Sequence, residues 1–341
     1  MEYSPGLRGV IAGETKISTV GMEGTSLRYR GYDAIKLTET HTYEDAASLI
    51  ISDDLDGSEF TNNFIKYYGE LTNDKDINKL FVEIKSRLHP MDVIRTVVSY
   101  IGDSDKNSDL ESTTKILAAV SYVIASYNDN DTSELDQEYT VASSMLSNKV
   151  STDELQALDD ILILYAEHGF NASTFATRVT ASTRSDLTSS IVSGIGTLKG
   201  ELHGGANERA VELINSFKDI NDAETGVLKM LEEKKKIMGF GHGVYKIQDP
   251  RSPVVKRWVE KLVSDDDSKL RFEIAKKIDE IMDKEKKLFP NVDFYGGLLL
   301  SELDFDVNLF TPIFVAGRSV GWAAHYFEQR ADDTLIRPAA K

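Results

Sequence analysis

Apolar residues spaced three and four positions apart recur from Tyr43 almost to the C-terminus, and this period restricts the chain to a mainly helical fold. The clearest stripe runs from Leu155 to Tyr165 and stops before Gly169, where a helix can end. No strand pattern alternates with these segments, so a βαβ architecture is not expected. We predict helices over 43–53, 58–72, 75–88, 91–102, 111–127, 134–148, 152–168, 171–183, 186–198, 206–218, 223–237, 252–264, 267–287 and 312–328.

Three segments stand apart from this pattern. Residues 7–37 alternate apolar and polar side chains between glycines, which predicts one or two short N-terminal β hairpins. The segment Pro290–Asp293 predicts a turn. Residues 312–328 are apolar on nearly every side, as expected of a helix buried in a domain core or a subunit interface.

Composition limits the class of protein. A chain of 341 residues that is 41% hydrophobic can form two domains of ordinary size or one large domain. It begins without a basic stretch followed by an apolar one, and no apolar run approaches the ~18 residues of a membrane span. We therefore expect a cytoplasmic protein that does not enter a membrane. The absence of cysteine excludes disulfides and thiolate metal sites.

The formal net charge of −17 argues against an extended surface for nucleic acid or anionic membranes. One segment reverses this trend, because residues 234–257 carry a single acid, Asp249, among seven basic residues. Such a local positive region suits a small polyanionic ligand, although a solvated helix face has the same composition. The seven are Lys234, Lys235, Lys236, Lys246, Arg251, Lys256 and Arg257.

Two of the six histidines lie in glycine-rich turns. His203 stands in Gly200–Glu208, directly before a predicted helix, and His242 stands in Gly239–Lys246. Glycine lets a ligand approach the main chain, and the free N–H groups of a following helix favour negative charge. Each imidazole could therefore exchange a proton beside an anionic ligand. Taken singly, each stretch is also what an ordinary turn looks like.

Other common sites fit the sequence poorly. A metal centre would need His168, His203, His242 and a carboxylate from distant positions, since no HExxH pair and no cysteine is present. We therefore expect no metal. Neither a phosphate-binding GxxxxGK[ST] loop nor a GxSxG nucleophile turn occurs.

Two charged residues lie among apolar neighbours. Asp293 has the surroundings of a general base, because desolvation raises the pKa of a carboxyl group, but an aspartate before an apolar run is also a common helix N-cap. Arg318 is the one charged residue within the apolar 312–325 run of the last predicted helix. Its guanidinium requires an anionic partner, either from the protein or from a ligand.

Together these motifs resemble the citrate synthase family. They are Glu-Leu-His-Gly-Gly-Ala-Asn-Glu at 201–208, Gly-Phe-Gly-His-Gly-Val-Tyr-Lys at 239–246, Asp-Pro-Arg at 249–251, Asn-Val-Asp-Phe-Tyr at 291–295, and Leu-Phe-Thr-Pro-Ile-Phe at 309–314 with Arg318. They occur in the order found in the family. Gly6–Val10 and Leu335–Pro338 extend the resemblance over nearly the whole chain.

The resemblance implies a citrate-synthase-like, multi-helical two-domain fold that forms a homodimer. It places a large domain at 1–205 and 312–341 and a smaller domain on the coenzyme A side at 206–311. It also implies an acyltransferase of the tricarboxylic acid cycle, which condenses acetyl-CoA with oxaloacetate and hydrolyses the thioester. Neither a metal nor a prosthetic group is part of the family's chemistry.

The resemblance also assigns roles. Asp293 would remove the methyl proton of acetyl-CoA, His203 would stabilise the enolate oxygen, and His242 would protonate the oxaloacetate carbonyl. His168, His242, Arg251, Arg318 and Arg337 would bind oxaloacetate, with Arg337 reaching across from the partner subunit. For coenzyme A, Lys246 matches a phosphate contact, and Lys256 is a candidate by position only.

Some positions depart from the family pattern and bear on the substrate. Glu201 replaces a frequent proline, Gly243 replaces a bulkier residue, and Gly296 replaces a frequent serine. The segments 170–175 and 6–32 resemble 2-methylcitrate synthases, which use propionyl-CoA, so that activity is the alternative. A helical dimer that binds acyl-CoA without catalysis is a more remote one. Because a carboxylate beside His203 would raise the pKa of its ring, we predict that Glu201 faces solvent or an arginine.

Overall fold

The computed structural model describes residues 4–7, 9–102, 107–128, 140–146 and 150–340. Across these residues the chain forms sixteen α-helices and one small sheet, which confirms the mainly helical prediction. The helices are α1 Ala34–Thr40, α2 Tyr43–Ser52, α3 Ser58–Asn73, α4 Lys75–Lys85, α5 Pro90–Ile101, α6 Asp109–Tyr127, α7 Val141–Met145, α8 Thr152–Tyr165, α9 Ala172–Ser182, α10 Leu187–Leu198, α11 Ala206–Asn215, α12 Ile220–Glu232, α13 Ser252–Leu262, α14 Asp266–Lys286, α15 Val292–Glu302 and α16 Phe310–Asp332.

Helix α16 forms the centre of the larger group of helices. It packs against α2, α5, α6, α8, α9 and α10, and every residue from Phe310 to His325 is buried. The apolar content of this segment predicted a buried helix, and that prediction is confirmed. Burial of so many side chains makes α16 a rigid support for any polar group it carries.

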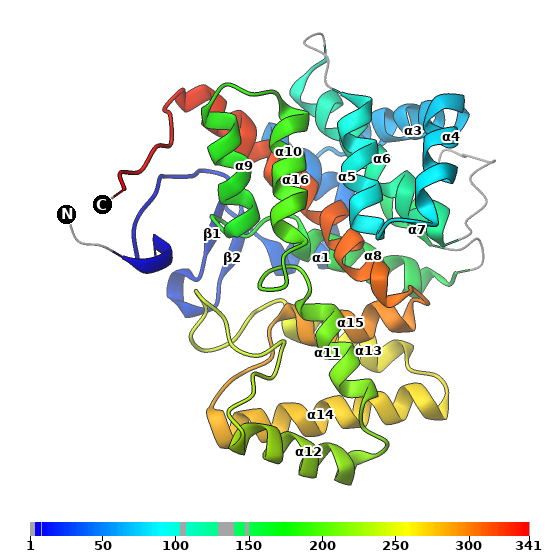
Figure 1. The fold of residues 1–341 in the computed structure, drawn as a ribbon, viewed down its shortest axis with the longest axis vertical. Helices are drawn as coiled ribbons and strands as arrows, with labels where there is room; N and C mark the ends of the chain where they lie inside the picture. The colour runs from blue at the N-terminus through cyan, green and yellow to red at the C-terminus, as the bar shows by residue number, and fades with distance from the viewer. Residues whose placement is uncertain (1–3, 8, 103–106, 129–139, 147–149, 341) are drawn as a thin grey trace.

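Helices α11 to α15 form a smaller group beside the larger one (Figure 1). Within it, α12 lies on α14, while α11 and α13 pack against α15. Helix α8 touches both α13 and α15, and α11 touches α16, so these elements line the junction between the groups. The chain passes into the smaller group through 199–205 and returns through 303–309, close to the predicted domain boundaries. That the groups are separate domains stays a prediction.

The N-terminal region contains one antiparallel sheet, as the hairpin prediction expected. Its strands are β1 Ser18–Val20, β2 Leu27–Tyr29 and β3 Tyr32–Asp33, with Thr19 opposite Arg28. Short 3₁₀ turns occupy Pro5–Leu7, Met22–Gly24 and Val307–Leu309. Arg8, part of the first family motif, lies outside the described residues.

The sequence missed two helices. Helix α1 begins inside the segment read as hairpin, because the Asp33 side chain accepts hydrogen bonds from the N–H groups of Ile35 and Lys36 and starts a helix there. Helix α15 follows what we predicted only as a turn. The side chain of Asn291 accepts from the N–H of Asp293 and caps α15.

Several predicted bounds also shift. Helix α8 ends at Tyr165 instead of 168, and α12 spans 220–232 instead of 223–237 because Asp219 caps it at the N–H of Asp222. Of the helix predicted over 134–148, residues 141–145 form α7, whereas 134–139 and 147–148 lie outside the described residues. Among the helices of the described ranges, none is both long enough and apolar enough to cross a membrane.

Candidate active site

His203 lies in the loop between α10 and α11, at the entrance to the smaller group. The loop is tight at Gly204, whose N–H donates to the Leu198 carbonyl at 2.9 Å. A Cβ at this glycine would stand 2.4 Å from that oxygen, so a larger residue would open the loop. The loop directs the His203 ring toward Ser173 in the first turn of α9.

The contacts with Ser173 fix the tautomer of His203. Its Nε2 accepts the main-chain N–H of Ser173 at 3.2 Å and lies 2.8 Å from the hydroxyl of the same residue. A ring nitrogen that accepts carries no proton, so the proton of the neutral ring is on Nδ1. Burial, followed by the charge of Arg318, lowers the pKa of His203 to about 4. At neutral pH His203 is therefore an uncharged hydrogen-bond donor through Nδ1.

The loop that carries His242 is paired with the segment leading into α15. The N–H of Gly241 donates to the Phe289 carbonyl at 2.8 Å, and the N–H of Asn291 donates to the Gly239 carbonyl at 2.9 Å. Gly239 has a φ of 82°, and a Cβ there would meet the Cβ of residue 294 at 2.8 Å, so the pairing depends on glycine. His242 and the first turn of α15 are thereby held next to each other.

His242 is held in the opposite tautomer to His203. Its Nδ1 accepts the N–H groups of Val244 and Tyr245 at 3.0 and 3.1 Å, which leaves the proton on Nε2. Burial and then the charge of Arg251 lower its pKa to about 4, against the opposing effect of Asp249. This ring is also a neutral donor at pH 7.

His168 lies in the turn between α8 and α9 and meets His242. The centroids of the two rings are 5.0 Å apart at an interplanar angle of 74°. The Nε2 of His168 lies 3.1 Å from the hydroxyl oxygen of Tyr245, whose own ring contacts His242. Burial, aided by the charge of Arg251, holds the pKa of His168 well below its usual value.

Asp293 occupies the first turn of α15, partly buried, one residue beyond the start of the helix. Asn291 is the N-cap, so the alternative in which Asp293 caps the helix is wrong. Desolvation raises the pKa of Asp293 to about 6, although the charges of Arg251 and Arg318 oppose the rise. A carboxylate with this pKa is a stronger base than a solvated one and is still mostly ionised at pH 7.

The two buried arginines of this cluster, Arg251 and Arg318, differ in their partners. Arg251 donates from Nε and Nη2 to the carboxylate of Asp249 at 2.9 and 2.8 Å. Asp249 also accepts the N–H of Val292 at 3.1 Å, which ties Arg251 to α15. Arg318 donates Nε to the Tyr165 carbonyl at 2.6 Å, and among the described residues no carboxylate oxygen lies within 4.0 Å of its guanidinium. Arg318 therefore has no directly paired carboxylate, and its guanidinium can bind the anion of a ligand directly.

Three predicted residues are not brought to this cluster. Arg337 is exposed in the tail after α16, and this tail runs outward from the larger group of helices (Figure 1). Lys246 is exposed, and its Nζ donates to the Gly243 carbonyl at 3.0 Å. Lys256 instead pairs with Asp279 at 3.1 Å and lies over the ring of Tyr295, so its charge is already partly balanced.

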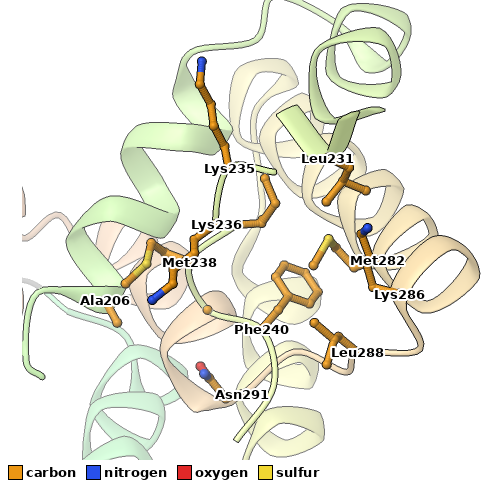
Figure 2. Close-up of a pocket in the computed structure, with 12 residues that line it drawn as sticks. Ala206, Leu231, Lys235, Lys236, Met238, Phe240, Met282, Lys286, Leu288 and Asn291 are labelled. Carbon is orange, nitrogen blue, oxygen red and sulfur yellow. The ribbon is translucent and has the colours of Figure 1, made fainter. Parts of the chain in front are cut away.

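A cavity of about 430 Å³ opens next to the His242 loop. Figure 2 shows the Phe240 ring in its middle, between Met282 and Leu288 on one side and the chain of residues 235–238 on the other. Lys235 and Lys236 at this wall are exposed, as is Lys286 on α14. An apolar floor rimmed by cations suits a flat, anionic ligand.

Some of these features could not be read from the sequence. Ser173, which fixes His203, lies 30 residues before it. Asp249 was noted in a basic segment and in the Asp-Pro-Arg motif, but its pairing with Arg251 was not predicted. The prediction for Glu201 is confirmed, because its carboxylate pairs with Arg209 at 3.0 Å and both side chains are largely exposed. Within the described ranges no group of three or more His, Asp or Glu side chains is arranged as a metal site.

The sequence matches known proteins over its full length. The family model described as "Citrate synthase, C-terminal domain" matches residues 6–339. A 2-methylcitrate synthase from Shewanella oneidensis is 41% identical, with 98% of this chain and 93% of the relative covered. Citrate synthase 2 from Bacillus subtilis is 34% identical, with 100% of this chain and 95% of the relative covered.

Solved structures agree with the sequence comparison. The citrate synthase of Thermoplasma acidophilum, in a ternary complex with carboxymethyl coenzyme A and oxaloacetate, gives a TM-score of 0.89 at 28% identity, covering 99% of this chain and 95% of that one. The citrate synthase of Thermotoga maritima gives a TM-score of 0.86 at 33% identity, covering 98% and 94%. The likeness therefore includes the arrangement of helices around the site.

Proposed function

This chain belongs to the citrate synthase family, whose members are acyltransferases that condense an acyl-CoA with oxaloacetate, and from that premise we propose that it is a citrate synthase. The reaction joins acetyl-CoA to oxaloacetate and then hydrolyses the citryl thioester. One observation carries the proposal: His203 and His242 are both neutral donors, each through its free ring nitrogen, in the site that also holds the base-like Asp293. A protein that only bound acyl-CoA would not need all three groups.

Oxaloacetate binds first in this proposal, through its two carboxylates. Arg318 has both Nη groups available, and Arg251 keeps Nη1 after its bonds to Asp249. Bidentate guanidinium pairing fixes the orientation of a carboxylate, which sets the angle of the keto group. The Nε2 proton of His242 then donates to the keto oxygen, and His168 supplies a further contact.

The carbon–carbon bond forms in two proton-coupled steps. Asp293 accepts a methyl proton from acetyl-CoA while the Nδ1 proton of His203 donates to the thioester oxygen, giving the enol. The enol carbon attacks the keto carbon of oxaloacetate, the enol proton returns to Nδ1 of His203 as the thioester carbonyl re-forms, and the keto oxygen takes the Nε2 proton of His242. Water then attacks the thioester carbonyl and releases coenzyme A as the free thiol. Each positioned proton transfer typically contributes about 10²- to 10⁴-fold in rate.

Coenzyme A fits the cavity of Figure 2 by chemistry. Its nucleotide is flat and carries phosphates, which match the apolar floor and the exposed Lys235, Lys236 and Lys286. Lys246 stands on the same loop as His242, four residues beyond it, and Lys256 remains a weaker candidate because of its pair with Asp279. The proposed reaction uses no metal or prosthetic group, since proton transfer and hydrogen bonding supply its chemistry.

Release of free thiol from acetyl-CoA and from propionyl-CoA, each with and without oxaloacetate, tests the proposal. We expect release from acetyl-CoA that depends on oxaloacetate. The second candidate is 2-methylcitrate synthase activity, favoured by the 41% identity to one such enzyme, and a large preference for propionyl-CoA would establish it instead. Absence of oxaloacetate-dependent release from both thioesters would overturn both.

We further propose that the active form is a homodimer in which Arg337 completes the partner's site. Support comes from its exposed position outside the cluster that it is expected to serve. Mixing Asp293→Asn subunits with Arg337→Ala subunits tests this. In the mixed dimer an intact Asp293 site receives an intact Arg337 from the other chain, so activity should return. If Arg337 acts within its own chain, the mixture stays inactive.

A further inference from the structure

The carboxylate of Glu167 forms a closed turn around His168. Glu167 is fully buried, and its Oε1 accepts the N–H of Gly169 at 2.5 Å, so the side chain before His168 is bonded to the main chain after it. The same oxygen accepts the hydroxyl of Ser18 on β1 and the Nε2 proton of His325 on α16, both at 2.9 Å. The main chain on both sides of His168 is therefore tied to β1 and α16, which fixes the backbone from which its ring projects.

A second layer holds His325. Its Nδ1 lies 3.0 Å from Nη1 of Arg178 on α9, and a guanidinium can only donate, so Nδ1 accepts and the ring proton is on Nε2, facing Glu167. Arg178 in turn donates to Glu328 at 2.6 Å and to Gln329 at 3.0 Å. Both Arg178 and His325 are buried. The chain of contacts joins β1, the α8–α9 turn, α9 and α16.

The second carboxylate oxygen of Glu167, Oε2, faces α16 at Gly321, between Arg318 and His325 along the helix. A Cβ on Gly321 would stand 2.6 Å from Glu167 Oε2, which has no hydrogen-bond partner among the residues that the structure describes. Residues 318, 321 and 325 lie on one face of a helix, so this oxygen lies along the face shared by Arg318 and His325. Burial lowers the pKa of Arg318, and the negative charge of Glu167 is the largest influence that opposes this fall.

We propose that Glu167, held in place by His325 and Arg178, is the positioning residue of the oxaloacetate half of the site, orienting His168 and balancing the buried charge of Arg318. This inference rests on the proposed function. It is specific to oxaloacetate, because the contacts of His203 and the coenzyme cavity involve none of these groups.

Glu167→Gln keeps the volume but removes the charge. We expect the KM for oxaloacetate to rise about 10- to 100-fold, the range for losing a bond to a charged group, with the KM for acyl-CoA within about twofold. Ser18→Ala removes a single donor and should raise the same KM only about three- to tenfold. His325→Gln, whose amide N–H can replace the Nε2 proton, should lie closer to wild type than His325→Leu.

Asp159→Asn is the matched control. Asp159 is a buried carboxylate on α8, the helix that precedes the turn of Glu167, and among the described residues it accepts only the main-chain N–H of Tyr43. Its loss should therefore lower thermal stability without changing the KM for oxaloacetate. An unchanged oxaloacetate KM in both Glu167→Gln and Ser18→Ala would overturn the inference while wild-type turnover still supports the synthase. If Glu167→Gln does not fold, Ser18→Ala decides alone. Wild-type protein without oxaloacetate-dependent turnover would instead overturn the proposed function.

Discussion

The histidine–aspartate cluster and the lysine-rimmed cavity are joined by one loop, yet their polar groups are held in opposite ways. In the cluster each imidazole has one nitrogen fixed by a partner, and for His203 that partner comes from a separate helix. In the cavity the lysines are exposed, and Lys235 pairs only with Glu233, two positions away. The difference separates two tasks, because proton transfer requires fixed geometry, whereas attraction of an anion does not.

The largest expected effect follows from removing the base. Asp293→Asn keeps the shape and the capping of α15 by Asn291 but cannot accept a proton. We expect kcat to fall about 10²- to 10⁴-fold while oxaloacetate binding, measured by calorimetry, is retained. Turnover near that of the wild type would show that the rigid cluster does not contain the base.

The pH dependence tests the same group without mutation. Because Asp293 acts only when deprotonated and its pKa is about 6, kcat/KM should fall about tenfold per pH unit below 6. His203 and His242, with pKa values near 4, stay neutral over this range. Because the pKa of Asp293 is higher in the folded than in the unfolded chain, its protonation stabilises the folded protein at low pH, and this stabilisation is lost as pH rises through 6. Asp293 therefore does not cause unfolding in acid. A kcat/KM that stays flat between pH 5 and 7 would contradict the assignment.

The cavity should respond more weakly. Lys235→Ala and Lys236→Ala each remove one exposed charge, worth about 1 kcal/mol at most, so the KM for acyl-CoA should rise about fivefold or less with kcat unchanged. Raising the salt concentration should reduce the difference in the KM for acyl-CoA between these variants and the wild type. Lys284→Ala, an exposed lysine of α14 outside the cavity, is the control and should have no effect. A large loss of kcat at either cavity lysine would erase the contrast between the two regions.

The smallest effect is expected at Glu201, although it is only two residues from His203. Its pair with Arg209 is exposed, and exposed pairs contribute about 1 kcal/mol or less to stability. Glu201→Gln should leave kcat and the acid limb of the pH profile unchanged. A shifted profile would mean that the carboxylate reaches the His203 ring during turnover.

The sequence predicted the members of the cluster because they lie in local motifs. Glycines around His203 and His242, and an arginine inside an apolar helix, are visible within a few residues of each group. The partners that fix them were not visible, since Ser173 meets His203 and Glu167 meets His325 only after distant helices have packed. Such contacts leave no periodic pattern in the chain.

Helix α15 was missed because its sequence has no apolar stripe. In α15 the apolar residues surround the helix instead of forming a stripe, because Val292, Phe294, Tyr295 and Leu298–Leu300 are all buried. A helix buried on all sides has no period to detect. The partner of Lys256 was likewise not visible in the sequence, because Asp279 lies on α14 and pairs with it only in the folded chain.

The pairing of residues 239–241 with 289–291 has a consequence for engineering. Because this short ladder joins the loop of His242 to the start of the helix that carries Asp293, neither segment can be exchanged alone with that of a relative. A chimera that replaces only the loop would have to rebuild the ladder against foreign side chains. Transplanting residues 239–293 as one block carries His242 and Asp293 together with the pairing that sets their spacing. Acyl selectivity can then be varied between relatives without moving these two groups relative to each other.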